Sequence, residues 1–184
     1  MKLIRDALAK RDIQTTNVAI DATGGGDPFS AILAREIGHG FINVQFGGRP
    51  SDIAVSSTDK RTGRERFANQ VSELWGILPT LNRAQQLRGI TPDLITELSS
   101  RLFDDSSKLK VEAKDEMKKR TGKSPDLGDS FALLCHVCRM KHGLSSTERA
   151  KPGAQRRQGS FQEMIAKVFG ATEGVGAASS GWAE

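Results

Sequence analysis

A short apolar segment, a helical segment and a second apolar segment follow each other early in the chain, and this order most constrains the fold. NVAID (17–21) ends in an acid followed by glycines, which is typical of a buried strand. Asp27 predicts a helix cap and Pro28 the first helical position, in a helix that runs to about Ile37. FINVQF (41–46) alternates apolar and polar residues, which predicts another strand. These segments form a βαβ unit, so we expect parallel strands joined by a right-handed crossover.

The following residues have mostly helical patterns. KLKVEAK (108–114) is an exception, because its alternation of polar and apolar residues predicts a strand. Apolar periodicity and capping residues followed by proline predict helices at residues 2–11, 64–79, 92–103 and 125–141. Together these elements predict one α/β domain over residues 1–142.

The composition changes after Gly143. Residues 143–184 are rich in Gly, Ala and Ser and include the basic stretch AKPGAQRRQG. Such a segment buries too little apolar surface to fold by itself, so we expect a mostly disordered, basic tail. FQEMIAKVF (161–169) differs from its surroundings and predicts a short helix that becomes ordered against a partner.

The overall composition restricts the class of protein. Lys and Arg total 27 against 22 Asp and Glu, which gives a net charge of +5 and a mild preference for polyanionic partners. Two cysteines do not form a disulfide framework, which indicates a reducing compartment. The sequence has no run of 18 apolar residues, and its first residues are too charged for a secretory signal. We therefore expect a soluble, cytoplasmic protein without a membrane partner.

Asp126 and Asp129 are three residues apart, on the first turn of the helix predicted after Ser124 and Pro125. Acids in a first turn interact favourably with the helix dipole, which is a purely structural explanation. It does not account for Asp21, at the carboxyl end of a predicted strand, where ligands bind in open α/β sheets. One strand-end carboxylate facing two on a helix could bind Mg²⁺ or Mn²⁺, and two such ions can cleave a phosphodiester. The residues alone leave both explanations open.

Longer stretches around these acids resemble a known family. The large terminase subunits of tailed phages carry segments similar, in order and spacing, to VAIDATGGG, INVQFGGRPSD, RFANQVSELWGIL and VEAKDEMKKRTGKSPDLGDSFAL. The resemblance covers residues 1 to about 142 and concerns the later part of the C-terminal nuclease domain. It implies a partial RNase H-like domain, with mostly parallel strands flanked by helices. The last segment is also similar to Holliday-junction resolvases of the same superfamily.

The resemblance implies a site and an activity. Asp21, Asp126 and Asp129 would bind two Mg²⁺ or Mn²⁺ ions, and the protein would cleave double-stranded DNA endonucleolytically during genome packaging. Lys114 matches a lysine that the family places near these acids, where it could hold the scissile phosphate; the alternative is a solvated lysine at a strand end. The implied partners are double-stranded DNA, the portal and the small terminase subunit. The implied location is the cytoplasm of the bacterial host, transiently at the procapsid portal.

The sequence also departs from the family. Nothing in it corresponds to the N-terminal ATPase motor, and it begins at the helix that precedes the fourth strand of an RNase H-like domain. We therefore expect that the first strands, with one essential metal-binding aspartate, are missing, and that a separately encoded ATPase or upstream segment acts with this chain. One alternative is a catalytically inactive prophage remnant that binds DNA or the portal through its basic tail. Another is a resolvase-like nuclease, which the segments FGGRPSD and NQVSELW disfavour.

Two further motifs resemble ligand-binding motifs but are better explained without a bound ligand. TGKS (121–124) resembles the end of a P-loop, but Met117 stands where the earlier glycine is required, so we expect no ATP site. Cys135 and Cys138 have a spacing found in zinc sites, yet no second pair of ligands accompanies them. They predict buried helical cysteines.

A polar pair lies on the helix predicted at 64–79. Asn69 and Glu73 are four residues apart, so they share one face of the helix, and Trp75 lies beside them. They match a helix of the terminase family. We expect them to form hydrogen bonds or packing contacts within the domain.

Overall fold

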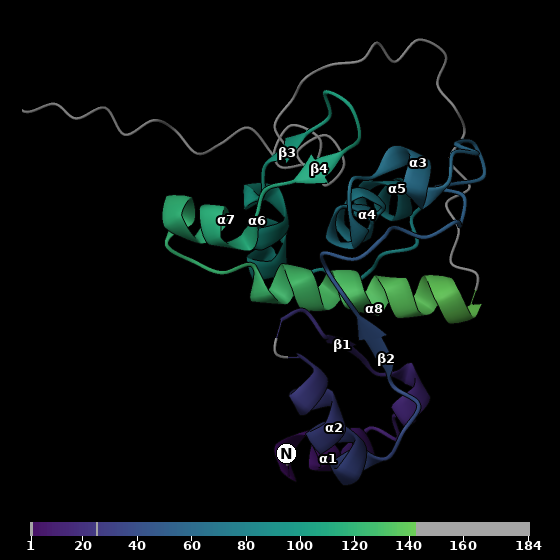
Figure 1. Cartoon of the computed structure of the whole chain (residues 1–184), viewed down its shortest axis with the longest axis vertical. Helices are drawn as coiled ribbons and strands as arrows, with labels where there is room; N and C mark the ends of the chain where they lie inside the picture. Colours follow the sequence, from purple (N-terminus) through teal and green to yellow (C-terminus); the bar gives the residue numbers. More distant parts are fainter. Residues whose placement is uncertain (1, 25, 143–184) are drawn as a thin grey trace, which may run out of the picture.

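The computed structural model describes residues 2–24 and 26–142 and shows a mixed α/β protein (Figure 1). The predicted tail and the helix predicted at 161–169 lie outside these residues. The elements, in chain order, are α1 (Lys2–Lys10), the 3-10 turn η1 (Thr15–Asn17), β1 (Ala19–Asp21), α2 (Gly26–Ile37), β2 (Ile42–Val44), α3 (Gly63–Arg66), α4 (Gln70–Gly76), α5 (Leu78–Arg83), α6 (Pro92–Ser100), β3 (Phe103–Asp104), β4 (Lys110–Val111), α7 (Lys114–Thr121) and α8 (Asp126–His142).

The predicted βαβ unit is present. β1 and β2 are parallel and α2 connects them, with Ala19 opposite Ile42 and Asp21 opposite Val44. The paired segments are shorter than the predicted strands, with three residues each. In the part of the chain that the structure describes, β1 pairs with β2 alone. The cap predicted at Asp27 concerns a side chain outside the described residues.

The helix predicted at 64–79 is divided into α3, α4 and α5. The first break lies at Asn69, whose extended backbone starts α4 and whose side chain accepts a hydrogen bond from Ser72 N. The second lies at Ile77, and Pro79 stands in the first turn of α5. Capping by Asn and a proline in the first turn are both typical of a new helix, so the continuous apolar pattern concealed two boundaries.

Residues 101–113 were predicted incorrectly in part. The helix predicted to reach residue 103 ends at Ser100, and Phe103–Asp104 pairs with Lys110–Val111 in an antiparallel hairpin. The strand predicted at 108–114 therefore keeps only two paired residues. Lys114, predicted at the end of that strand, is instead the first residue of α7. The described sheets thus comprise one parallel and one antiparallel pair.

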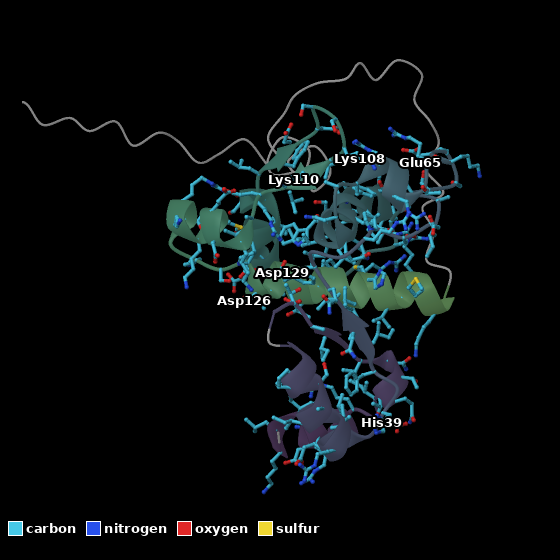
Figure 2. The ribbon with its side chains drawn as sticks, in the orientation of Figure 1. His39, Glu65, Lys108, Lys110, Asp126 and Asp129 are labelled. Carbon is cyan, nitrogen blue, oxygen red and sulfur yellow. The ribbon has the colours of Figure 1, made fainter. Side chains whose placement is uncertain are left out.

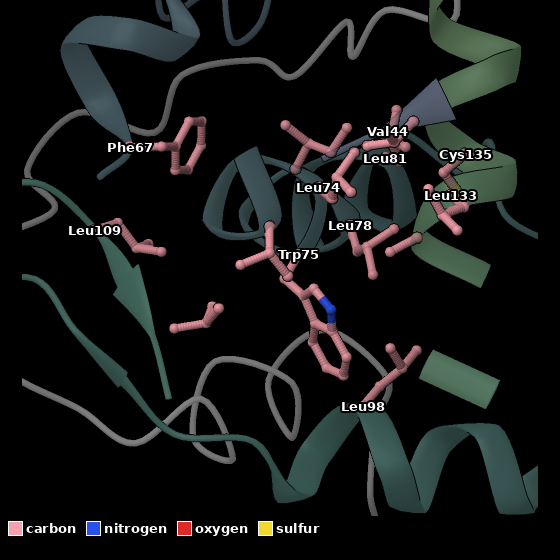
Figure 3. Close-up of a cluster of buried hydrophobic side chains, with 14 residues drawn as sticks. Val44, Phe67, Leu74, Trp75, Leu78, Leu81, Leu98, Leu109, Leu133 and Cys135 are labelled. Carbon is pink, nitrogen blue, oxygen red and sulfur yellow. The ribbon is translucent and has the colours of Figure 1, made fainter. Parts of the chain in front are cut away.

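Helix α8 connects the two parts of the fold. Figure 1 shows β1, β2, α1 and α2 on one side of α8 and α3 to α7 with β3 and β4 on the other. Helix α8 packs against β1, α4 and α6. The core lies around α4, where Leu74, Trp75 and Leu78 are completely buried. Figure 3 shows Trp75 between α4 and the side chain of Leu98 on α6. The first turns of α8 therefore lie against this core, where Gly128 faces Trp75 and Leu98.

None of the helices within residues 2–24 and 26–142 is long and apolar enough to cross a membrane.

Candidate active site

Asp129 is an acid placed inside the core. It lies one turn after the start of α8, on the face of the helix that packs against α4 and α6. Its side chain is only 8% exposed. Its Oδ1 accepts hydrogen bonds from Trp75 Nε1 and Arg101 Nη1, each at 2.9 Å. Charge-assisted bonds of this kind fix the orientation of a carboxylate. Asp129 is therefore held by two separate elements of the core.

Arg101 supplies the counter-charge. Its side chain is 3% exposed, its Nε donates to the carbonyl oxygen of Glu112 at 3.0 Å, and its guanidinium lies 4.5 Å from the centre of the Trp75 ring. Burial lowers the pKa of Arg101, and the neighbouring Asp129 carboxylate opposes this effect. Arginine stays protonated in proteins, so a buried ion pair results. No pattern in the sequence pointed to Arg101, because it follows α6 as a single charged residue.

Asp126 and Lys114 form a second, exposed ion pair beside the first. Lys114 Nζ donates to Asp126 Oδ1 at 2.7 Å and lies 3.5 Å from Asp129 Oδ2. Hydrogen bonds from Lys114 and Ser124 lower the pKa of the Asp126 carboxyl. Partial burial of Lys114 favours its neutral form, but the two carboxylates outweigh it and raise the pKa of the ammonium. Figure 2 shows Asp126 and Asp129 at the same end of α8.

The second oxygen of Asp129 has no hydrogen bond. Oδ2 is buried, and no donor among the described residues lies in bonding geometry to it. Its partner is Lys114, whose ammonium forms an ion pair with Oδ2 at 3.5 Å without a hydrogen bond. A buried carboxylate oxygen without a hydrogen bond is costly and needs an explanation. One side of this carboxylate is thus tied to the core, while the other faces Lys114 and Asp126. A metal cation bound at Oδ2 would coordinate this oxygen more closely than the Lys114 ammonium does.

Asp21 lies on the neighbouring strand and is exposed, and its Oδ1 accepts a hydrogen bond from Thr23 N at 2.9 Å. Strand β1 packs against α8, and Lys141 Nζ donates to Asn17 Oδ1 at 3.0 Å. Since Asn17 precedes β1 and Lys141 is near the end of α8, β1 starts at the C-terminal end of α8. Within residues 2–24 and 26–142, no three His, Cys, Asp or Glu residues are grouped closely enough to hold a metal ion. The structure therefore joins Asp126 and Asp129 through Lys114 and does not bring Asp21 into the same group.

Glu73 has the structural role that the sequence indicated. It is completely buried, and its carboxylate accepts hydrogen bonds from Ser51 N, Ser51 Oγ and Arg139 Nη1, each at 2.6 Å. Arg139 also donates to the carbonyl oxygen of Ala54 at 2.7 Å. This ion pair connects α4, α8 and the loop after β2. Asn69 caps α4 through its side chain, so it also forms the structural hydrogen bond that the sequence predicted.

The two cysteines are unpaired, and both belong to α8. Cys135 is buried, as predicted, whereas Cys138 is only half-buried. Burial raises the pKa of the Cys135 thiol to about 12, so this thiol is unreactive near neutral pH.

Comparison of the chain with protein-family models, curated proteins and solved structures found no match.

Gly128 lies between Asp126 and Asp129, and its substitution tests the packing of the site. A Cβ at this position would lie 2.6 Å from Cη2 of Trp75, so we expect Gly128→Ala to displace the indole that donates to Asp129. Overpacking costs about 1–3 kcal/mol, and the higher helix propensity of alanine returns up to about 1 kcal/mol. Urea-induced unfolding should therefore show a net loss of about 1–2 kcal/mol, from the middle of these ranges.

Gly47→Ala is the matched control, because a Cβ there meets no atom within 4 Å. We expect it to change stability by less than about 0.5 kcal/mol. Equal unfolding midpoints for the two variants would show that the Trp75 ring can move without cost.

Proposed function

We propose that residues 1–142 form the later part of an RNase H-like nuclease domain of a terminase large subunit, which cleaves double-stranded DNA with the help of Mg²⁺ or Mn²⁺. The segments that resemble that family support the proposal, because they carry the acids of the candidate site. The structural observation that carries it is the buried Oδ2 of Asp129, which has an ion pair with Lys114 but no hydrogen bond and lies beside the carboxylate of Asp126. Hard divalent cations prefer carboxylate oxygens of this kind.

The donor set fits such an ion. Asp129 offers one oriented oxygen, because Trp75 and Arg101 hold the other. Asp126 has an exposed carboxylate one turn earlier on the same helix. Asp21 at the end of β1 does not group with these two acids, so it would have to move toward them to become a third ligand. When bound, the ions would activate a water molecule and stabilise the oxygen that leaves the phosphorus.

Lys114 would bind the scissile phosphate. Its ammonium is half exposed, stays protonated because the adjacent carboxylates raise its pKa, and lies within 3.5 Å of both acids. A protonated lysine at this place can contact a phosphate oxygen while the acids hold the ions. Backbone phosphates would supply most of the DNA affinity, in keeping with the net charge of +5. The portal, the small terminase subunit and a separately encoded ATPase are the partners that this function implies.

One observation favours a second function. Lys114 and Arg101 together already balance the charges of the two acids, so ion pairs could take the place of metal ions in a non-catalytic module that binds DNA or the portal. The two functions differ in whether a divalent cation binds next to Trp75.

Metal binding can be measured without relying on cleavage. In a Trp182→Phe background only Trp75 fluoresces, and its indole is hydrogen-bonded to Asp129. We expect Mn²⁺ to quench this fluorescence with saturation, since Mn²⁺ is paramagnetic and would bind at the adjacent Oδ2. Asp126→Asn should weaken Mn²⁺ binding by about tenfold or more. Replacing a residue that only hydrogen-bonds to a metal ligand already lowers metal affinity by that factor.

Asp115→Asn removes an exposed acid beside Lys114 and is the matched control for surface charge. Unchanged quenching in Asp126→Asn, or no saturable quenching at all, would favour the non-catalytic module. Nicking of supercoiled plasmid with Mn²⁺ then tests cleavage. We expect slow nicking by this chain alone and faster nicking with a polypeptide that supplies the upstream segment. A four-way junction cut faster than a duplex would indicate a resolvase-like enzyme.

A further inference from the structure

The ammonium of Lys114 contacts one oxygen of each acid in the candidate site. Its Nζ lies 2.7 Å from Asp126 Oδ1 and 3.5 Å from Asp129 Oδ2. A metal ion that bridges the two acids needs the same oxygens, and it would lie closer to them, at about 2.0–2.1 Å for Mg²⁺. Two cations cannot share this place, because like charges repel at such short distances. A bridging metal ion and the Lys114 ammonium therefore compete for the two carboxylates.

The burial of Asp129 Oδ2 indicates which group has to move. This atom is almost inaccessible to solvent, so an ion reaches it only after a neighbouring group is displaced. Trp75 and Arg101, which hold the other oxygen, are at most 2% exposed and belong to the core. The Lys114 side chain is 44% exposed, and a lysine ammonium is carried on a flexible four-carbon stem. Lys114 is thus the contacting group that can leave without disturbing the core.

The backbone of Lys114 is fixed, which limits how far the ammonium can move. Lys114 is the first residue of α7, and Met117 buries the next turn of this helix in the core. On the other side, Glu112 N donates a hydrogen bond to the carbonyl oxygen of Leu102 at 2.8 Å. A displaced ammonium consequently stays within side-chain reach of the acids. A phosphate oxygen of a bound nucleic acid is a ligand that it can contact there.

We propose that Lys114 is a tethered counter-ion that a divalent ion displaces from Asp126 and Asp129, and that it then binds a backbone phosphate of DNA. The metal ion and the phosphate reinforce each other, because the ion releases the ammonium and the phosphate keeps it away from the acids. Such coupling is reciprocal, so each ligand increases the affinity for the other by the same factor. This inference rests on the proposed function, since it requires that the two acids bind a divalent ion.

Mn²⁺ quenching of Trp75 fluorescence measures the competition. In the Trp182→Phe parent, we expect Lys114→Gln to tighten Mn²⁺ binding by about tenfold, because two ion pairs no longer have to be broken. Lys114→Arg keeps a cation beside the acids, and it should bind Mn²⁺ as weakly as the parent does. If Lys114 served only to hold α7 against α8, its replacement by Gln would leave the Mn²⁺ affinity unchanged or lower it.

Lys118→Gln is the matched control for the loss of a positive charge. Lys118 is exposed on the next turn of α7 and its charge acts on Asp126, but among the described residues it forms no ion pair with either acid. This variant should change the Mn²⁺ affinity much less than Lys114→Gln does.

The outcomes separate this inference from the proposed function. Equal Mn²⁺ affinities of the parent and Lys114→Gln would overturn the competition and leave the proposed function standing. Saturable quenching in Lys114→Gln alone would support the competition and contradict a metal-dependent activity of the unsubstituted chain. The absence of saturable quenching from both proteins would overturn the inference and the proposed function together.

A short DNA duplex tests the coupling between metal and phosphate. We expect saturating duplex to tighten Mn²⁺ binding by about fivefold or more, the lower end of typical coupling between sites. This gain should disappear in Lys114→Gln and persist in Lys118→Gln. Anisotropy of a labelled duplex confirms that each protein is saturated, and the Trp75 signal reports ions near Asp129 instead of ions elsewhere on the DNA. An equal gain in Lys114→Gln would overturn the transfer of the ammonium to a phosphate.

Discussion

Replacing Glu73 by alanine is expected to lower the free energy of unfolding by about 3–5 kcal/mol, because it leaves a buried cation without its counter-charge. Arg139 is 6% exposed and its Nη1 lies 2.6 Å from Glu73 Oε1. The substitution also removes the acceptor of two hydrogen bonds from Ser51. Gly63 contacts the carboxylate so closely that a Cβ would lie within 2.7 Å of it, so the acid has no room to move. Urea-induced unfolding followed by circular dichroism measures the loss.

Glu36→Ala is the matched control, since Glu36 is an exposed helical glutamate on α2. Its effect should stay within about 0.5 kcal/mol. The double variant Glu73→Gln, Arg139→Met removes both charges, and we expect it to recover much of the lost stability. A loss below roughly 1 kcal/mol in Glu73→Ala would mean that Arg139 finds solvent, and that the ion pair does not tie α4 to α8.

Asp129→Asn is expected to lower the free energy of unfolding by about 3 kcal/mol, even though asparagine keeps an acceptor for Trp75 and Arg101. The reason is that Arg101, which is 3% exposed, loses the only negative charge that it contacts through an ion pair among the described residues. Asp126→Asn should cost less than about 1 kcal/mol, because the Asp126 side chain is 74% exposed and its ion pair with Lys114 is screened by water. Thermal or urea-induced unfolding of the two variants gives the comparison.

A double-mutant cycle with Arg101→Gln isolates the coupling of the buried pair. We expect the double variant to be more stable than the sum of the two single losses predicts. Additive losses would show that Arg101 and Asp129 act independently. The comparison matters for the interpretation of cleavage assays, because under the proposed function Asp129→Asn would change folding and metal binding together. Asp126→Asn changes the candidate metal ligand with little effect on folding, so it is the sharper test.

Local patterns predicted the elements that depend on neighbouring residues. The βαβ unit was predicted from two short apolar segments that flank a capped helix. Helix α8 begins at Asp126, one residue after the proline that predicts its start. Asn69 and Glu73 were assigned to structural bonding because their spacing placed them on one helix face, and the structure confirms this. In each case the sequence signal lies within a few residues. The interaction itself can be distant, as in the bond between Glu73 and Arg139.

The features that escaped prediction depend on distant residues. The hairpin of β3 and β4 pairs strands of two residues each, too short for any periodic pattern to appear. Arg101 meets Asp129 across 28 positions, and a single arginine after a helix indicates nothing about its burial. The position of Lys114 at a helix start, and hence its bond to Asp126, followed from the end of that hairpin.

Strand β1 has a consequence for how the candidate site could be built. Val18 O accepts a hydrogen bond from Ile42 N, and Ala22 N donates to Val44 O. The residues between them that have odd numbers therefore direct their backbone N–H and C=O groups to the opposite edge of the sheet. Asp21 is one of them, and within the described residues no strand covers that edge. A strand added there would hydrogen-bond to Asp21 itself and run past its carboxylate. Under the proposed function, a partner that supplied such a strand would extend the sheet and place its own side chains beside Asp21 in one binding event, so strand binding and metal binding would be coupled.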